Sequence, residues 1–137
     1  MYLLDTNVIS ELRHGKPKQS QAVRAWSADK EMNRLYLSAI TVLELEKGVQ
    51  ALERKLPPQV GALRDWLDRV KFAFADRILP FTQDTAVLCA GLHFPDPKPE
   101  RDAMIAATAL QHRMTLVTRN VADFEATGIA LINPFTA

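Results

Sequence analysis

The chain has 137 residues, 47% of them hydrophobic and 24% charged, which is enough apolar material for one core and predicts a single domain over residues 1–137. Its 17 basic and 16 acidic side chains give a formal net charge of +1, so the overall charge indicates no general affinity for nucleic acid. The one cysteine, Cys89, excludes an internal disulfide and a cysteine-rich zinc site, and its apolar neighbours predict a buried, unreactive thiol.

The first half of the chain predicts two short strands, each followed by helix. In chain order the expected elements are a strand at 2–4, a helix that Gly15 ends, a helix at 19–30, a strand at 35–37 and a helix from Thr41 toward Arg54. Leu56, Pro57 and Pro58 then break the chain, because proline cannot continue a helix.

The second half repeats this alternation. The expected elements are a helix at 59–75, an extended run at 78–81, a helix at 84–92, a helix at 102–113 and strands at 115–118 and 129–132. Prolines at three alternate positions predict an extended, stiff segment over residues 94–99. The helix at 59–75 carries an apolar stripe that packs either on the domain's own core or on a partner; it comprises Val60, Leu63, Leu67, Val70 and Phe74, with Trp66 beside it.

Alternating strands and helices are typical of an α/β fold. We therefore expect a mostly parallel sheet of four to five strands with helices on both faces. Functional groups in such folds gather beyond the carboxyl ends of the strands.

Four acidic residues follow or lie near the expected strands: Asp5, Glu44, Asp102 and Asp123. Each has a structural explanation by itself. Asp5 and Asp102 can cap the helices that follow them, Asp123 can cap a short helical turn, and Thr41 with Glu44 fits a capping box.

The four acids together favour a site, because a cap serves its own helix and has no reason to meet other caps. If the strands form one parallel sheet, all four carboxylates gather at its carboxyl end and repel one another. They therefore imply a divalent cation, and oxygen donors suit Mg²⁺ or Mn²⁺. The histidines, His14, His93 and His112, are scattered along the chain, which argues against zinc.

Four segments around these acids resemble the successive motifs of PIN-domain ribonucleases, most closely the VapC-type toxins and, within them, the FitB-like group. The segments are 4–11 (LDTNVISE), 41–48 (TVLELEKG), 101–109 (RDAMIAATA) and 116–124 (LVTRNVADF). They stand in the family's order and span nearly the whole chain, whereas residues 51–76 match no motif.

The resemblance implies a Mg²⁺-dependent endoribonuclease, with Mn²⁺ as a substitute, acting as the toxin of a type II toxin–antitoxin pair. It implies that Asp5, Glu44, Asp102 and Asp123 form the catalytic pocket, with Asp5 and Asp102 as direct metal ligands. Residues expected to hydrogen-bond these carboxylates or bound waters are Thr6, Asn7 and Thr118.

The expected partners follow from the same resemblance. They are an RNA substrate, a small DNA-binding antitoxin through which alone DNA is contacted, and a second copy of the chain in a homodimer or a higher assembly. Arg101 and Arg119 flank two of the acids and are candidate phosphate contacts. With neither a signal leader nor a membrane-length apolar run in the sequence, we expect a cytoplasmic protein without membrane contact.

Two other readings of the acids stay open. A receiver or haloacid-dehalogenase-type phosphoryl-transfer protein also places carboxylates and Mg²⁺ on a parallel sheet. It fits less well, because Asn7 stands where such a phosphatase needs a second acid and residues 78–81 supply no acid for a receiver. The second alternative is a non-catalytic PIN-like module that binds RNA or protein.

Overall fold

A computed structural model describes residues 1–55, 58 and 60–136 of the chain. Five strands form one sheet in the order β3-β2-β1-β4-β5, and every neighbouring pair is parallel. The strands are β1 (Tyr2–Leu4), β2 (Leu35–Ser38), β3 (Ile78–Leu79), β4 (Thr115–Val117) and β5 (Leu131–Ile132). The expected parallel sheet is confirmed, with strands one to two residues shorter at several ends.

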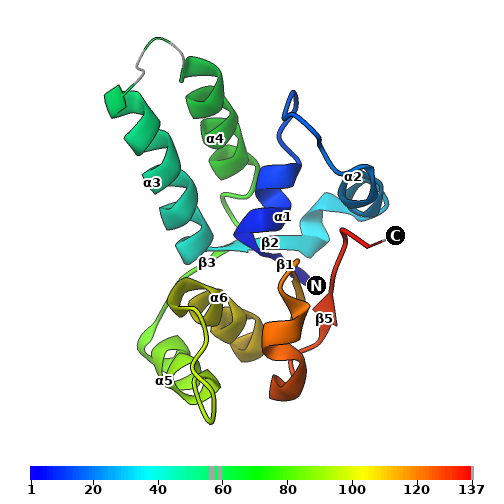
Figure 1. The fold of residues 1–137 in the computed structure, drawn as a ribbon, viewed down its shortest axis with the longest axis vertical. Coiled ribbons are helices and arrows are strands. Elements are labelled where there is room, and N and C mark those ends of the chain that lie inside the picture. The colour runs from blue at the N-terminus through cyan, green and yellow to red at the C-terminus, as the bar shows by residue number, and fades with distance from the viewer. Residues whose placement is uncertain (56–57, 59, 137) are drawn as a thin grey trace.

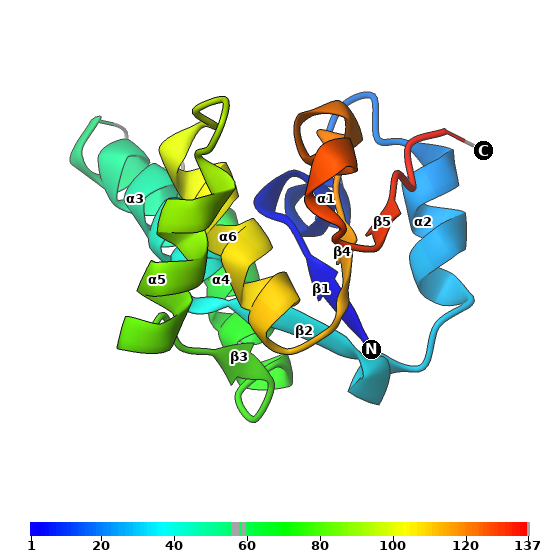
Figure 2. The same cartoon turned by 90° about the horizontal axis from the view of Figure 1, so that it is seen from below.

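Helices cover both faces of this sheet, as expected (Figures 1 and 2). They are α1 (Thr6–Glu11), α2 (Gln21–Ala28), α3 (Ala39–Lys55), α4 (Gly61–Ala73), α5 (Gln83–Leu92) and α6 (Glu100–Gln111), with the 3₁₀ helices η1 (Met32–Arg34) and η3 (Val121–Thr127). One core cluster joins the sheet to α1, α2, α3 and α4, and a second joins it to α5, α6 and η3.

The two cores follow from the alternation of side chains along β1. Leu4 packs in the first cluster and Leu3 in the second, because successive residues of a strand point to opposite faces. In the second cluster α6 presents small side chains to its neighbours, and Ala103, Ala106 and Ala107 are completely buried. Cys89 is buried in the same cluster, as expected, and burial raises the pKa of its thiol.

Three expected helix starts are wrong. Helix α3 begins at Ala39, where the Ser38 hydroxyl accepts a hydrogen bond of 3.0 Å from the Ile40 amide, so Thr41 and Glu44 do not form a capping box. Helix α6 begins at Glu100 behind Pro99, which leaves Asp102 in the first turn and not at the cap. Asp123 likewise lies within η3. In each case the helix begins two residues before the residue that the sequence pattern favoured as its cap.

The proline-rich segment is also different from the expectation. The chain bends through residues 94–96 and only then runs extended toward α6. Proline restricts φ but leaves ψ free, so a run of alternate prolines is compatible with a bend.

The apolar stripe of α4 packs on the domain's own core. Val60, Leu67 and Phe74 are buried in the first cluster, and Leu63, Trp66 and Val70 pack against it partly buried. The expected helix start at Gln59 and the chain break at Leu56 and Pro57 lie outside the described residues. No helix in the described part of the chain is long and apolar enough to cross a membrane.

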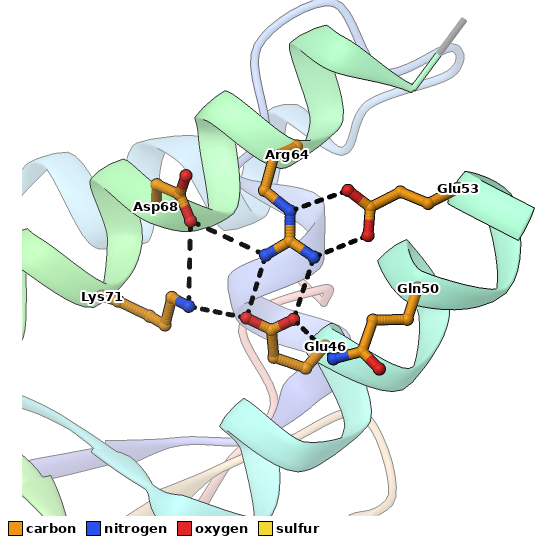
Figure 3. Close-up of polar contacts among 6 residues, drawn as sticks. All are labelled: Glu46, Gln50, Glu53, Arg64, Asp68 and Lys71. Carbon is orange, nitrogen blue, oxygen red and sulfur yellow. Dashed lines mark hydrogen bonds and ion pairs between the residues drawn. The ribbon is translucent and has the colours of Figure 1, made fainter. Parts of the chain in front are cut away.

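Charged side chains hold α3 and α4 together on the solvent side (Figure 3). The Arg64 guanidinium donates to both carboxylate oxygens of Glu46 at 3.0 Å and to Glu53 at 2.8 and 3.1 Å. Lys71 adds an ion pair of 2.6 Å to Glu46. These donors lower the pKa of Glu46 from 4.5 to about 2. The network links the two helices on one side while the apolar stripe links them to the core.

Candidate active site

Asp5 stands immediately after β1 and caps α1, as one of the two readings of the sequence expected. Its Oδ1 accepts a hydrogen bond of 2.7 Å from the Thr6 amide, and its Oδ2 accepts from the Thr118 hydroxyl at 2.7 Å and from Asn7 Nδ2 at 3.3 Å. The residue is only 5% exposed. Burial raises the pKa of Asp5 above its usual value, the charges of Asp102 and Glu44 add to the rise, and the hydrogen bonds oppose it.

Glu44 reaches the same place from α3. Its Oε1 accepts a hydrogen bond of 2.7 Å from the Thr6 hydroxyl, whose oxygen also lies 3.1 Å from the Thr41 hydroxyl. Its Oε2 pairs with Arg101 Nε at 3.4 Å. Thr6 therefore joins two acids, since its amide bonds Asp5 and its side chain bonds Glu44.

Asp102 approaches from the first turn of α6. Its Oδ2 accepts from Asn120 Nδ2 at 3.3 Å. Partial burial raises the pKa of Asp102, the charges of Glu44 and Asp123 add to the rise, and Asn120 opposes it. Asp123 is exposed at the start of η3, so it stands at the solvent edge of this group.

The donor set suits a magnesium ion. Among the described residues no three His, Cys, Asp or Glu side chains stand close enough to enclose a metal by themselves. Mg²⁺ does not require such a cage, because it keeps several of its waters and is usually held by one or two carboxylates. Burial raises the pKa values of Asp5 and Asp102. Repulsion adds to both rises, from Asp102 and Glu44 at Asp5 and from Glu44 and Asp123 at Asp102, and a cation beside them would remove that repulsion.

Two residues of this group received no role in the site from the sequence, although Thr41 was expected to cap a helix. The Asn120 side chain donates a hydrogen bond to Asp102, and its backbone amide donates to the Thr118 hydroxyl oxygen at 3.0 Å. Because Thr118 in turn bonds Asp5, Asn120 couples Asp102 to Asp5. Thr41 lies fully buried against the Thr6 hydroxyl. Both lie inside the motif segments, and this position was the one sign in the sequence that they belong to the site. Their contacts could not be predicted, because their partners are distant in sequence.

The two flanking arginines are placed differently. Arg101 pairs with Glu44 and keeps 43% of its side chain exposed. The Arg119 guanidinium stacks on the Phe135 ring, 3.9 Å from its centroid, and the Arg119 amide donates to Asn7 Oδ1 at 3.3 Å. Of the two side chains only that of Arg101 contacts one of the four acids, and neither inserts between Asp5 and Asp102 through any contact in the described structure.

Comparison with known sequences identifies relatives along the full chain. The sequence profile of the PIN domain matches residues 2–129. The chain is 38% identical to the toxin FitB of Neisseria gonorrhoeae, covering 98% of this chain and 99% of the toxin. It is 39% identical to the VapC ribonuclease Y4jK of Sinorhizobium fredii, with 98% of both chains covered.

Solved structures show the same architecture. A chain of FitAB bound to the IR36 DNA fragment superposes with a TM-score of 0.87 at 36% identity, over 100% of this chain and 97% of that one. A toxin–antitoxin complex from Klebsiella pneumoniae superposes with a TM-score of 0.70 at 26% identity, over 98% of both chains.

Proposed function

The chain belongs to the PIN-domain family, and on this premise we propose that it is a metal-dependent endoribonuclease and the toxin of a type II toxin–antitoxin pair. Its relatives include a named ribonuclease and a named toxin that match it from end to end. The observation that carries the proposal is the junction at Thr6, which holds Asp5 and Glu44 side by side through bonds of 2.7 Å each.

In this proposal Asp5 and Asp102 hold Mg²⁺, which Mn²⁺ can replace. When bound, the cation neutralises charge on the scissile phosphate and lowers the pKa of a coordinated water. The side chains of Thr6, Asn7 and Thr118 do not bind the metal directly. The Asn7 amide and the Thr118 hydroxyl fix the Oδ2 atom of Asp5, which sets the direction in which its remaining lone pairs point.

Glu44 is the better placed of the two remaining acids to orient the attacking water. Thr6 and Arg101 each hold one of its oxygens, whereas Asp123 is exposed and makes no side-chain hydrogen bond within the described residues. The water attacks phosphorus in line with the 3′ oxygen, the P–O3′ bond breaks, and a 5′-phosphate and a 3′-hydroxyl result. Glu44 takes the proton that the water loses, and solvent supplies the proton of the leaving oxygen.

The partners proposed are an antitoxin protein, DNA contacted through that antitoxin, and a second copy of the chain. The antitoxin and the DNA are supported by similar structures, a FitAB assembly on DNA and a toxin–antitoxin complex, and the second copy of the chain is proposed from the family resemblance. The acids also suit an antitoxin that neutralises the site with a basic side chain, since Glu44 already accepts the guanidinium of Arg101.

Cleavage of a mixed RNA pool by the purified protein tests the catalytic proposal. We expect cleavage with Mg²⁺ or Mn²⁺, none with EDTA, and a loss of at least about 100-fold in Asp5→Asn and in Asp102→Asn, because each removes a proposed ligand. Asp84→Asn is the matched control, since Asp84 is exposed on α5. Cleavage that persists in EDTA, or that Asp5→Asn leaves intact, overturns the mechanism.

A further inference from the structure

A cleft opens beside the acids and leads away from them. It has a volume of about 320 Å³, begins at Thr6 and Glu44, passes Gly48 on α3 and ends at Trp66 on α4. A second cavity of about 280 Å³ continues it, sharing Arg13, Leu63 and Trp66 and adding His14 and Arg69. The first volume lies at the lower end of the range for small-ligand sites, roughly 300–1,000 Å³.

The two walls of this cleft differ in chemistry. Arg13 and Lys16 stand on one side, after α1, and the Trp66 indole stands with aliphatic side chains on the other. Lys16 is engaged by Glu11 at 2.5 Å. Arg13 has no ion pair among the residues that the structure describes, so its guanidinium is available to a ligand. A cation facing an aromatic ring is the combination that single-stranded nucleic acid uses, with phosphate on one and base on the other.

We propose that this cleft is a nucleotide subsite for the RNA substrate. The base of a nucleotide flanking the scissile phosphate stacks on Trp66, and a neighbouring phosphate pairs with Arg13. The backbone then continues past Arg69, which lines the second cavity. The proposal rests on the proposed function, since Thr6 and Glu44 at the mouth of the cleft place the subsite next to the cleaved bond.

The charges favour RNA over a partner protein as the occupant. Arg13 lines the cleft and Arg69 its continuation, and neither has an ion pair among the residues that the structure describes. Two unpaired cations thus lie along the cavities that lead away from the acids, which a repeating phosphate backbone matches. A helical protein segment would satisfy the aliphatic wall but would need an acidic residue opposite Arg13.

Gly48 offers a direct way to close the cleft. A Cβ built at this position meets no atom within 4 Å, so a larger side chain enters open space. Gly48→Leu also replaces glycine within a helix by a better helix former, so the fold is expected to persist. Gly91→Leu is the matched control, because Gly91 lies in α5, has equally open surroundings and lines none of the cavities described.

Binding in EDTA separates this subsite from catalysis. In a Trp26→Phe background Trp66 is the only tryptophan, and a short oligo(A) RNA is titrated while the indole fluorescence is followed. We expect quenching, with affinity weakened about tenfold by Gly48→Leu and by Arg13→Ala, at the level of one lost stacking or phosphate contact. Gly91→Leu and Arg54→Ala, an exposed arginine at the end of α3, are expected to bind as the parent does.

Three results overturn the proposal. They are oligo(A) binding without a change in Trp66 fluorescence, undiminished affinity in Gly48→Leu, and quenching by a synthetic acidic amphipathic peptide but not by the RNA. If the wild-type protein does not cleave RNA but its Trp66 fluorescence is still quenched by oligo(A), the catalytic proposal is refuted and the subsite stands. A raised KM with unchanged kcat for Gly48→Leu supports both.

Discussion

The Thr118 hydroxyl donates a hydrogen bond of 2.7 Å to Asp5 Oδ2 across 113 residues of sequence. The two residues meet because β1 and β4 are adjacent and parallel, with Leu4 opposite Val117, so the residues that follow both strands emerge side by side. Asp5 is buried and accepts two side-chain donors at this one oxygen, which makes its orientation depend on the sheet and not on α1 alone.

Replacing Thr118 by valine tests that dependence. Valine keeps the shape but removes the donor to Asp5 and the acceptor for the Asn120 amide. We expect a loss of stability of about 1–3 kcal/mol in urea unfolding. We also expect the acid limb of the pH–rate profile to shift to higher pH, because this hydrogen bond lowers the pKa of Asp5 and its loss raises that pKa. Thr118→Ser keeps the hydroxyl, and a similar shift in that variant would contradict the assignment.

Magnesium is expected to stabilise the folded protein. A ligand at about 100 times its Kd adds about 2.7 kcal/mol, which corresponds to a rise in Tm of roughly 5–10 °C. Asp102→Asn should reduce this rise to a small fraction, and Asp84→Asn should preserve it, in thermal melts with and without saturating Mg²⁺. An identical Tm in Mg²⁺ and EDTA would count against the metal site.

Without metal, the raised carboxyl pKa values predict a specific pH dependence. The folded forms of Asp5 and Asp102 bind protons more tightly than the unfolded chain, whose carboxyl pKa is 3.8. The stability from these groups is therefore greatest at low pH and falls as pH rises from 3.8 through the raised values. In EDTA, the free energy of unfolding of Asp102→Asn minus that of the wild type should grow from pH 4 to pH 7. A constant difference would show that the pKa of Asp102 is not raised in the folded protein.

Glu46 is expected to give the opposite dependence. The pKa of Glu46 is about 2 in the folded protein and 4.5 in the unfolded chain. Its contribution to the free energy of unfolding is therefore complete above pH 4.5 and is lost as pH falls toward 2. Because the network is partly exposed, Glu46→Gln should cost only about 1–2 kcal/mol at pH 7. The cost should be smaller at pH 3 in urea unfolding. Glu31→Gln, at an exposed position without a capping bond, is the control.

The sequence by itself determined the parallel α/β fold. Short apolar runs and the 3.6-residue period of the helices are local patterns, and the chain obeys them at β1, β4 and α5. The sequence also indicated that Asp5 caps a helix, because a cap is a contact between near neighbours. It erred at Thr41, where a capping-box pattern lies inside a helix that begins at Ala39.

The resemblance pointed to Thr6, Asn7 and Thr118 as partners of the acids, but only the tertiary structure decided which acid each of them holds. Thr6 contacts Glu44 across 38 residues, and Asn120 contacts Asp102 across 18. Neither separation follows a helical or strand period, because each contact depends on which strands are adjacent in the sheet and how far α3 and α6 extend over its edge. The apolar stripe of α4 is a similar case. Its period is visible in the sequence, but whether it meets this domain or a partner depends on the surface opposite, and that surface exists only after β1 and β2 have paired.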